Sequence, residues 1–312
     1  MISVIIAAHN ESAVIGRCLD SLLADARPGE FAVTVVANGC SDDTAAIAAR
    51  RAGVRVLDRP EPGKVGALNA GDAVAVGFPR VYLDADIVLT TAGLRALAAA
   101  VADPTRARAA MPRRAVDVTG RPLLVRAYFA IHSRLPVFRE GLVGRGAIAL
   151  SAAGRARFDT FPEVTADDLF LDSLFAADEK QEVTEVASVV AAPLRTVDLV
   201  RRLTRVRAGN AALRSATKGD APNDGAPKDG APNGGAANGG APSDGGSNDG
   251  VRPARRMSWL HDVVVPRPWL APAAACYVVL TAMAALRARR PAGATGWARD
   301  ESSRQAAAAE TR

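Results

Sequence analysis

The sequence predicts an α/β fold with a mostly parallel central sheet, and three observations carry this prediction. Short apolar runs rich in Val and Ile recur between Ile2 and Leu83. Each run ends in a polar turn, and the turns are followed by segments whose apolar residues have helical spacing. Strands that alternate with helices at this spacing form βαβ crossovers, and ligands of such sheets bind beyond the carboxyl ends of the strands.

The first strand is expected at Ile2–Ala8, because this β-branched apolar run is too short to span a membrane. It ends at the polar turn His9-Asn10-Glu11, which has good helix-capping residues. The apolar residues that predict the first helix, before the breaker Pro28-Gly29, are Ile15, Leu19, Leu22 and Leu23.

The same cycle then repeats twice. The second helix begins with acidic residues, which suits the positive end of its dipole. Proline and glycine mark the loop before the third helix, which is rich in alanine. The expected elements are strands at Val33–Ala37 and Val54–Leu57 and helices at Asp42–Arg51 and Lys64–Val76.

Two carboxylates close the fourth expected strand. Asp84 and Asp86 follow the apolar run Val81-Tyr82-Leu83 and stand one residue apart. Such a pair can share a hard divalent cation, Mg²⁺ or Mn²⁺, that prefers oxygen ligands and leaves positions open for substrate phosphates. A polar strand end that opens a surface loop gives the same pattern, so the pair alone leaves both interpretations open.

Four segments in this order resemble family 2 glycosyltransferases with the GT-A fold: Val4–Glu11, Val35–Thr44, Gly63–Gly71 and Tyr82–Asp86. The resemblance implies a GT-A (Rossmann-like) domain over about residues 1–214 that takes a nucleoside-diphosphate sugar. It favours the metal interpretation of the acid pair. By resemblance, Asp86 and Asp84 bind the metal, and the residues that bind the nucleotide sugar are Ala8, Asn10, Glu11, Asn38, Lys64 and Asp84.

The resemblance continues into the acceptor side. Gly144 and Gly146 precede a strand that resembles the family's acceptor-side strand, where small residues let the backbone approach a ligand. The segment Thr165–Leu171 is similar to the family's ED motif, which implies that Asp168 is the catalytic base of an inverting enzyme. Its neighbour Asp167 replaces the usual Glu. A helix N-terminus that favours acids through its dipole is the alternative for this pair.

Two departures from the family pattern limit the detail. Asn38 stands where the family commonly has an acid that reads uracil, and an amide does not select uracil as a carboxylate would, so the donor nucleotide stays open. The Gln-x-x-Arg-Trp segment of processive members has no counterpart, which favours a non-processive enzyme. The basic residues in that region, Arg201, Arg202, Arg205 and Arg207, suit a diphosphate, with a solvated helix face or a contact with acidic lipids as the alternative.

Composition narrows the partners. The net charge is +6 and the pI about 9.7, but the basic residues are dispersed, so we expect anionic donors and an anionic membrane surface, and no nucleic acid. The three cysteines are widely separated, without zinc or disulfide spacing. The start lacks the basic region and cleavage site of a signal peptide, so a cytoplasmic catalytic domain is expected.

The C-terminal third divides into three expected parts. Residues 215–256 contain a degenerate five-residue repeat of Asp, Gly, Ala, Pro and Asn and should be a disordered linker. Residues 257–291 contain the uncharged segment Trp269–Leu286, followed by arginines. It should form a transmembrane or interfacial helix at the inner face of the cell membrane, or else a helix packed on the catalytic domain. Residues 292–312 should be a disordered tail.

Two other functions were weighed. A sugar-1-phosphate nucleotidyltransferase has a similar fold, but no glycine-rich loop with Arg and Lys follows the first strand. A non-catalytic nucleotide-sugar-binding protein would not need both acid pairs, Asp84/Asp86 and Asp167/Asp168. The sequence does not identify the sugar, nor whether the acceptor is lipid-linked or a small molecule.

Overall fold

The computed structural model describes residues 1–103, 107–136, 141–163, 167–219, 257 and 259–288. They form a seven-stranded sheet in the order β3-β2-β1-β4-β6-β5-β7. Strand β6 runs antiparallel to both of its neighbours, and the other pairs are parallel. The mostly parallel α/β sheet predicted above is thus confirmed. The strands are β1 (Ile2–Ala8), β2 (Phe31–Asn38), β3 (Val54–Arg59), β4 (Arg80–Asp84), β5 (Ala109–Asp117), β6 (Ala147–Leu150) and β7 (Lys180–Ala191).

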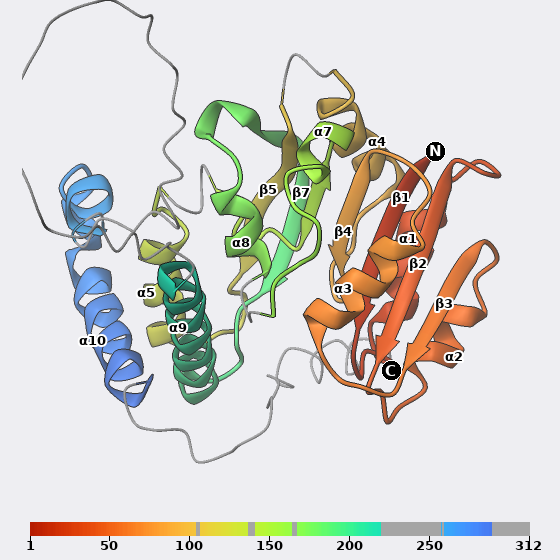
Figure 1. Cartoon of the computed structure of the whole chain (residues 1–312). Helices are drawn as coiled ribbons and strands as arrows, with labels where there is room; N and C mark the ends of the chain where they lie inside the picture. The colour runs from red at the N-terminus through yellow and green to blue at the C-terminus, as the bar shows by residue number, and fades with distance from the viewer. Residues whose placement is uncertain (104–106, 137–140, 164–166, 220–256, 258, 289–312) are drawn as a thin grey trace, which may run out of the picture.

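Helices cover both faces of the sheet (Figure 1). Thr90 caps α4 by accepting a hydrogen bond from the Gly93 N–H at 3.1 Å, and Ser151 caps α7 in the same way through Gly154 at 3.0 Å. The helices are α1 (Ile15–Leu23), α2 (Thr44–Ala49), α3 (Lys64–Ala73), α4 (Thr91–Ala100), α5 (Leu123–His132), α7 (Ala152–Arg155), α8 (Asp167–Ser173), α9 (Thr196–Gly219) and α10 (Ala271–Ala288), with short turns η1 (Ala177–Glu179), η2 (Trp259–Val264) and η3 (Pro268–Leu270).

Successive side chains of a strand point to opposite faces of the sheet, so the core consists of separate apolar clusters on the two faces. Val4 and Ile6 of β1 belong to one apolar cluster, with α1 and α4, whereas Ile5 belongs to another, beneath α3. Helix α3 approaches the sheet closely at Gly71, where a Cβ would lie 2.6 Å from Cγ2 of Ile5. A glycine at this point therefore lets the first turn of α3 lie over the carboxyl ends of the strands.

The predicted elements are found with small shifts. The first strand has the predicted bounds, and the helix predicted from Asp42 begins at Thr44 because the Asp42 carboxylate accepts the Thr44 N–H at 3.1 Å. Helix α9 runs to Gly219, beyond the expected domain boundary at residue 214. The rest of the expected linker and the tail lie outside the described residues.

Helix α10 packs against α5 and α9 (Figure 1). The ring of Tyr277 stacks on that of Tyr128 at 5.2 Å, and Arg207 Nη1 donates to the Thr281 carbonyl at 2.6 Å. Within the described residues, Pro268–Ala288 is the one helix long and apolar enough to cross a membrane. The helix expected at Trp269–Leu286 is therefore present, and in this structure one of its sides lies on the catalytic domain.

Candidate active site

The turns that follow β1 and β2 interlock at the carboxyl edge of the sheet. Asn10 has a φ of 52°, and its Oδ1 accepts the N–H of Ser41 at 2.8 Å. The Glu11 N–H donates to Thr44 Oγ1 at 2.7 Å, and Glu11 is buried. These contacts hold Asn10 and Glu11, both predicted to bind the nucleotide sugar, against the start of α2.

Asn38 connects three segments at the carboxyl edge of the sheet. Its side chain is buried, and its Nδ2 donates to the Ala8 carbonyl at 2.8 Å while its Oδ1 accepts the Gly63 N–H at 2.9 Å. The amide thus links the ends of β1 and β2 to the loop before α3. The predicted contacts of Ala8 and Asn38 with a nucleotide stay predictions.

Lys64, the first residue of α3, joins the donor-side and acceptor-side acids. Its Nζ lies 2.9 Å from Asp84 Oδ1 at the end of β4 and 2.9 Å from Asp167 Oδ2 at the start of α8. The side chains of Lys64 and Asp84 are 34% and 42% exposed, and that of Asp167 is 16% exposed. Partial burial disfavours the charged amine, but Asp167 and Asp84 outweigh it and hold the pKa of Lys64 well above its usual value. Lys64 is therefore a fixed cation between two predicted sites.

Asp168 is held by backbone donors on both of its oxygens. Oδ2 accepts the Gly144 N–H and Oδ1 accepts its neighbour Leu169's N–H, each at 2.8 Å. Burial, and then the negative charge of Asp167, raise the pKa of Asp168 to about 6, against the lowering effect of Lys64. A carboxylate that is oriented and more basic than usual has the properties of a general base.

Gly146 couples the acceptor-side loop to β4. Its carbonyl accepts the Asp84 N–H at 2.8 Å, and its φ is 70°. A Cβ here would lie 2.5 Å from Cγ1 of Ile87. Gly144, with a φ of 66°, turns the same loop so that its N–H meets Asp168. Both predicted acceptor-side glycines thus adjoin predicted catalytic or metal residues.

The donor set at the end of β4 fits a divalent cation that is completed by substrate. Asp86 is exposed, and Asp84 is partly exposed at the same strand end. In the described ranges, no three His, Cys, Asp or Glu side chains come together as a metal cage. Two carboxylates plus substrate phosphates are the usual protein environment of Mg²⁺, so the pair fits a metal that arrives with the donor.

This chain resembles known proteins in sequence and in fold. Residues 3–148 match the family model described as Glycosyl transferase family 2. Residues 3–148 form a family 2 glycosyltransferase domain. No curated protein sequence matches this chain.

A solved mannosyltransferase structure shows the same fold. The mannosyltransferase PcManGT from Pyrobaculum calidifontis, solved with GDP-Man and Mn²⁺, is 21% identical with a TM-score of 0.53, over 91% of this chain and 77% of that one. The 1-349 fragment of S. aureus TarS with UDP is 18% identical (TM-score 0.47), over 65% of this chain and 63% of that one. Glucosyl-3-phosphoglycerate synthase from Mycobacterium tuberculosis, with Mn²⁺, UDP and phosphoglyceric acid, is 20% identical (TM-score 0.46), over 60% and 69%. This chain therefore spans less than two thirds of the TarS fragment.

The arginines of α9 divide into two groups around the glycosyltransferase domain. Arg201 is 71% exposed and pairs with Asp198 of its own helix at 3.3 Å, and Arg205 is half-buried. Arg202 instead shares its surroundings with Arg114 of β5. Burial, followed by the charge of Arg202, lowers the pKa of Arg114 to about 10, and Asp168 acts on Arg114 in the opposite direction. Arg114 is thus close enough to the predicted base for their charges to interact, which the sequence did not indicate.

Sequence reasoning missed Arg114. The only signal for it in the sequence is the pair Arg113-Arg114, one residue after the apolar run Ala109–Met111. Two adjacent arginines after an apolar run could have been read as an anion-binding segment.

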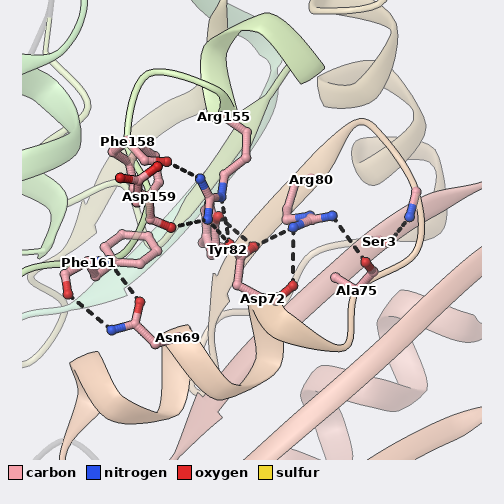
Figure 2. Close-up of polar contacts among 11 residues, drawn as sticks. Ser3, Asn69, Asp72, Ala75, Arg80, Tyr82, Arg155, Phe158, Asp159 and Phe161 are labelled. Atoms are coloured by element: carbon pink, nitrogen blue, oxygen red, sulfur yellow. Dashed lines mark hydrogen bonds and ion pairs between the residues drawn. The ribbon is translucent and has the colours of Figure 1, made fainter.

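A buried ionic cluster lies around Asp72, in the last turn of α3 (Figure 2). Asp72 Oδ1 accepts from Arg80 Nη1 at 2.6 Å and from the Tyr82 hydroxyl at 3.0 Å, and Oδ2 accepts from Arg155 Nε at 2.6 Å. Arg155 also donates to the carbonyl of Asp159 at 2.8 Å. The cluster therefore ties the last turn of α3 to the segment that leads toward α8.

Asn69, one turn earlier on α3, fixes the same segment. Its side-chain amide donates to the Phe161 carbonyl at 3.0 Å and accepts the Phe161 N–H at 2.8 Å (Figure 2). The ring of Phe161 packs edge-on against Tyr82 with centroids 5.0 Å apart. Together with Asp72, this contact holds the chain before Asp167 over the helix that carries Lys64.

Proposed function

We propose that this protein transfers a sugar from a nucleoside-diphosphate sugar to an acceptor hydroxyl, in a metal-dependent reaction that inverts the anomeric configuration. The observation that carries the proposal is the bridge from Lys64 Nζ to Asp84 and to Asp167, each at 2.9 Å. It joins the strand end assigned to the donor with the helix start assigned to the acceptor. A transfer reaction needs these two groups of residues on either side of one anomeric carbon.

Asp168 is the general base of the proposed reaction. A hydroxyl is a poor nucleophile at neutral pH, so a carboxylate within hydrogen-bond reach takes its proton as it attacks the sugar. The raised pKa of Asp168, about 6, supports this role, and so do the Gly144 and Leu169 N–H groups that orient its two oxygens. Each oxygen keeps a second lone pair for the acceptor hydroxyl.

Asp84 and Asp86 hold the divalent cation, Mg²⁺ or Mn²⁺, together with the phosphates of the donor. When bound, such an ion supplies Lewis-acid neutralisation of the charge on the departing nucleoside diphosphate. Lys64 fixes the Asp84 carboxylate and adds a positive charge on the donor side of the site. The mannosyltransferase of the same fold was solved with GDP-Man and Mn²⁺, which makes this donor and this ion the first to test.

The remaining features of the proposal follow from the sequence. The region Arg201–Asn210 lacks the Gln-x-x-Arg-Trp segment, so we expect one sugar to be transferred per encounter. Arg201 and Arg205 are proposed to attract the donor diphosphate. We further propose that the catalytic domain works on the cytoplasmic face of the cell membrane, on a lipid-linked or small acceptor.

A donor panel tests the proposal. The full-length protein is incubated with UDP-, GDP- and TDP-sugars with and without Mn²⁺, and release of nucleoside diphosphate is measured. We expect release from at least one donor that stops with EDTA and in Asp86→Ala. The control Asp25→Ala removes an exposed acid at the end of α1, away from the carboxyl ends of the strands, and should leave release unchanged.

Two outcomes would contradict the proposal. Release that continues in Asp86→Ala with EDTA present would remove the metal from the mechanism. Release of pyrophosphate from a nucleoside triphosphate and a sugar phosphate would identify a nucleotidyltransferase instead.

A further inference from the structure

The outer side of α10 is apolar and exposed. Val279, Met283 and Leu286 are 57%, 40% and 63% exposed, whereas Leu280 and Ala284 are buried against the domain. Large apolar side chains that gather on one side of a helix mark an interaction surface more often than single exposed ones do.

The first turns of α5 and α9 extend this surface. Leu123 and Leu124 of α5 are 77% and 47% exposed, and Val197 of α9 is 42% exposed. A groove of about 520 Å³ lies between the three helices. Its lining includes Leu124, Val197, Val200, Cys276, Val279 and Met283. We call the surface formed by Leu123, Leu124, Val197, Val279, Met283 and Leu286 the α10 face.

Positive charge borders the α10 face. Arg287 lines the groove at the last turn of α10, and the described residues from Val263 to Ala288 include Arg267 and Arg287 but no Asp or Glu. Arg195 and Arg201, 69% and 71% exposed at the start of α9, both pair with the buried Asp198. An apolar surface with a basic border complements an anionic lipid surface, whereas two copies of it would repel each other.

The contacts of α10 decide how it meets a bilayer. Its inner side is occupied by the Tyr277–Tyr128 stack and by the bond from Arg207 to the Thr281 carbonyl. A helix that crosses a bilayer alone is surrounded by lipid, and this one would first have to leave the domain. Trp269, 72% exposed just before α10, is the type of residue that sits at headgroup level.

We propose that the α10 face docks on the surface of an anionic bilayer, with α10 lying in the plane of the interface and still packed on the catalytic domain. The groove between α5, α9 and α10 then receives a hydrocarbon chain of the lipid. Binding energy comes from the buried apolar area and from attraction between the arginines and the headgroups. This inference does not depend on the reaction proposed above, since its test measures binding and not turnover.

Vesicle flotation of the full-length protein tests the docking. Vesicles of phosphatidylcholine alone are compared with vesicles that also contain phosphatidylglycerol. We expect the protein to float with the anionic vesicles, and the double variant Val279→Glu/Met283→Glu to bind roughly tenfold more weakly or worse, because charges resist insertion. The control Val76→Glu/Val189→Glu changes two residues that are 67% and 58% exposed outside the α10 face, and should bind like the wild type.

Folding is checked separately. Thermal unfolding should be similar in the wild type and both double variants, since the changed side chains are exposed. Leu123→Glu, on α5, provides a second variant of the α10 face that does not alter α10. A wild type that fails to bind anionic vesicles, or α10-face variants that bind as well as the control, would overturn the proposal.

Trp269 provides a probe of orientation. Lipids with brominated acyl chains should quench tryptophan fluorescence in the wild type, and Trp269→Phe should lose most of that quenching. Quenching that is unchanged in Trp269→Phe would show that the α10 face points elsewhere. Extraction by alkaline carbonate should release the protein, and retention would indicate a spanning helix. A lipid-free dimer that Val279→Glu/Met283→Glu dissociates would make the α10 face a contact between copies.

Discussion

The two ends of helix α3 use the same chemistry in opposite ways. At its first residue, Lys64 meets Asp84 and Asp167, and the pair with Asp84 is more than a third exposed. In its last turn, Asp72 meets Arg80 and Arg155, and its side chain is 5% exposed. Both ends hold a charge between two opposite charges.

Exposure separates the two roles. Charges that stay in contact with water can exchange one partner for another at little cost, whereas a buried carboxylate that loses a partner leaves an uncompensated charge. The Lys64 cluster is therefore suited to a ligand that comes and goes, and the Asp72 cluster is suited to hold the chain permanently. Four predictions test whether exposure makes this difference.

The largest effect is expected for Asp168→Asn. The amide keeps the size of the side chain but cannot accept a proton, so kcat should fall by roughly 10²- to 10⁴-fold, as for loss of a general base. Because the folded-state pKa of Asp168 lies above 3.8, its ionisation costs stability as the pH rises through about 6. The variant removes this cost but also loses one of the two backbone hydrogen bonds, because an amide nitrogen cannot accept an N–H, so its stability at pH 7 should change by only about 1 kcal/mol. Single-turnover transfer and urea unfolding measure the two quantities.

A loss of donor affinity as large as the loss of rate would place Asp168 in the nucleotide pocket. Titration of each protein with nucleoside diphosphate gives that affinity directly.

Asp72→Asn should act on stability instead. It leaves Arg80 and Arg155 buried beside a neutral amide, and breaking a buried ion pair costs about 3 to 5 kcal/mol. The matched variant Asp84→Asn, in the exposed cluster, should cost less than about 1 kcal/mol. Urea unfolding of both variants checks the difference. Equal losses would show that burial does not separate the two ends of α3.

Gly146→Ala tests how firmly the acceptor-side loop is joined to Asp84. The positive φ and the 2.5 Å approach to Ile87 together should cost about 2 to 4 kcal/mol. Gly120 also has a positive φ, 67°, but a Cβ there meets open space, so Gly120→Ala should cost only about 1 to 2 kcal/mol. The difference in unfolding free energy between the two variants isolates the packing contribution at Gly146. If the two variants lose the same free energy, the loop can move to accommodate the Cβ.

The smallest effect is a shift in pH dependence. If Asp168 is the base, kcat/KM should fall as the pH drops through about 6, because the carboxyl becomes protonated. Lys64 lowers the pKa of Asp168, so Lys64→Met should move the acid limb of the profile to higher pH. A profile that moves to lower pH in this variant would contradict the assigned surroundings of Asp168.

The sequence was sufficient where the signals are local. The elements from Ile2 to Asp84 were predicted because strand runs, turn residues and helical spacing each lie within a few residues of one another. The joint position of Asp84 and Asp167 was implied only by resemblance, since 83 residues separate them in the chain and a lysine from a third segment joins them.

Other features had no local signal. Asp72 reads as an ordinary acid near the end of an alanine-rich helix, and its partner Arg155 comes from another part of the chain. Helix α10 likewise has no local signal for its packing. Its composition fits a membrane, and its packed side became apparent only from its contacts with α5 and α9. Features that depend on pairing between distant segments, and on the burial it creates, could not be predicted from the sequence.

The amide of Asn38 makes its position resistant to redesign. A chemist who wished to convert the enzyme to strict use of uridine donors would first try Asn38→Asp, to restore the acid common in the resembling family. That exchange would replace the donor to the Ala8 carbonyl with a buried negative charge that faces carbonyl oxygens. The connection between β1, β2 and the α3 loop therefore depends on this one amide, and an acid at position 38 would require coordinated changes at both strand ends.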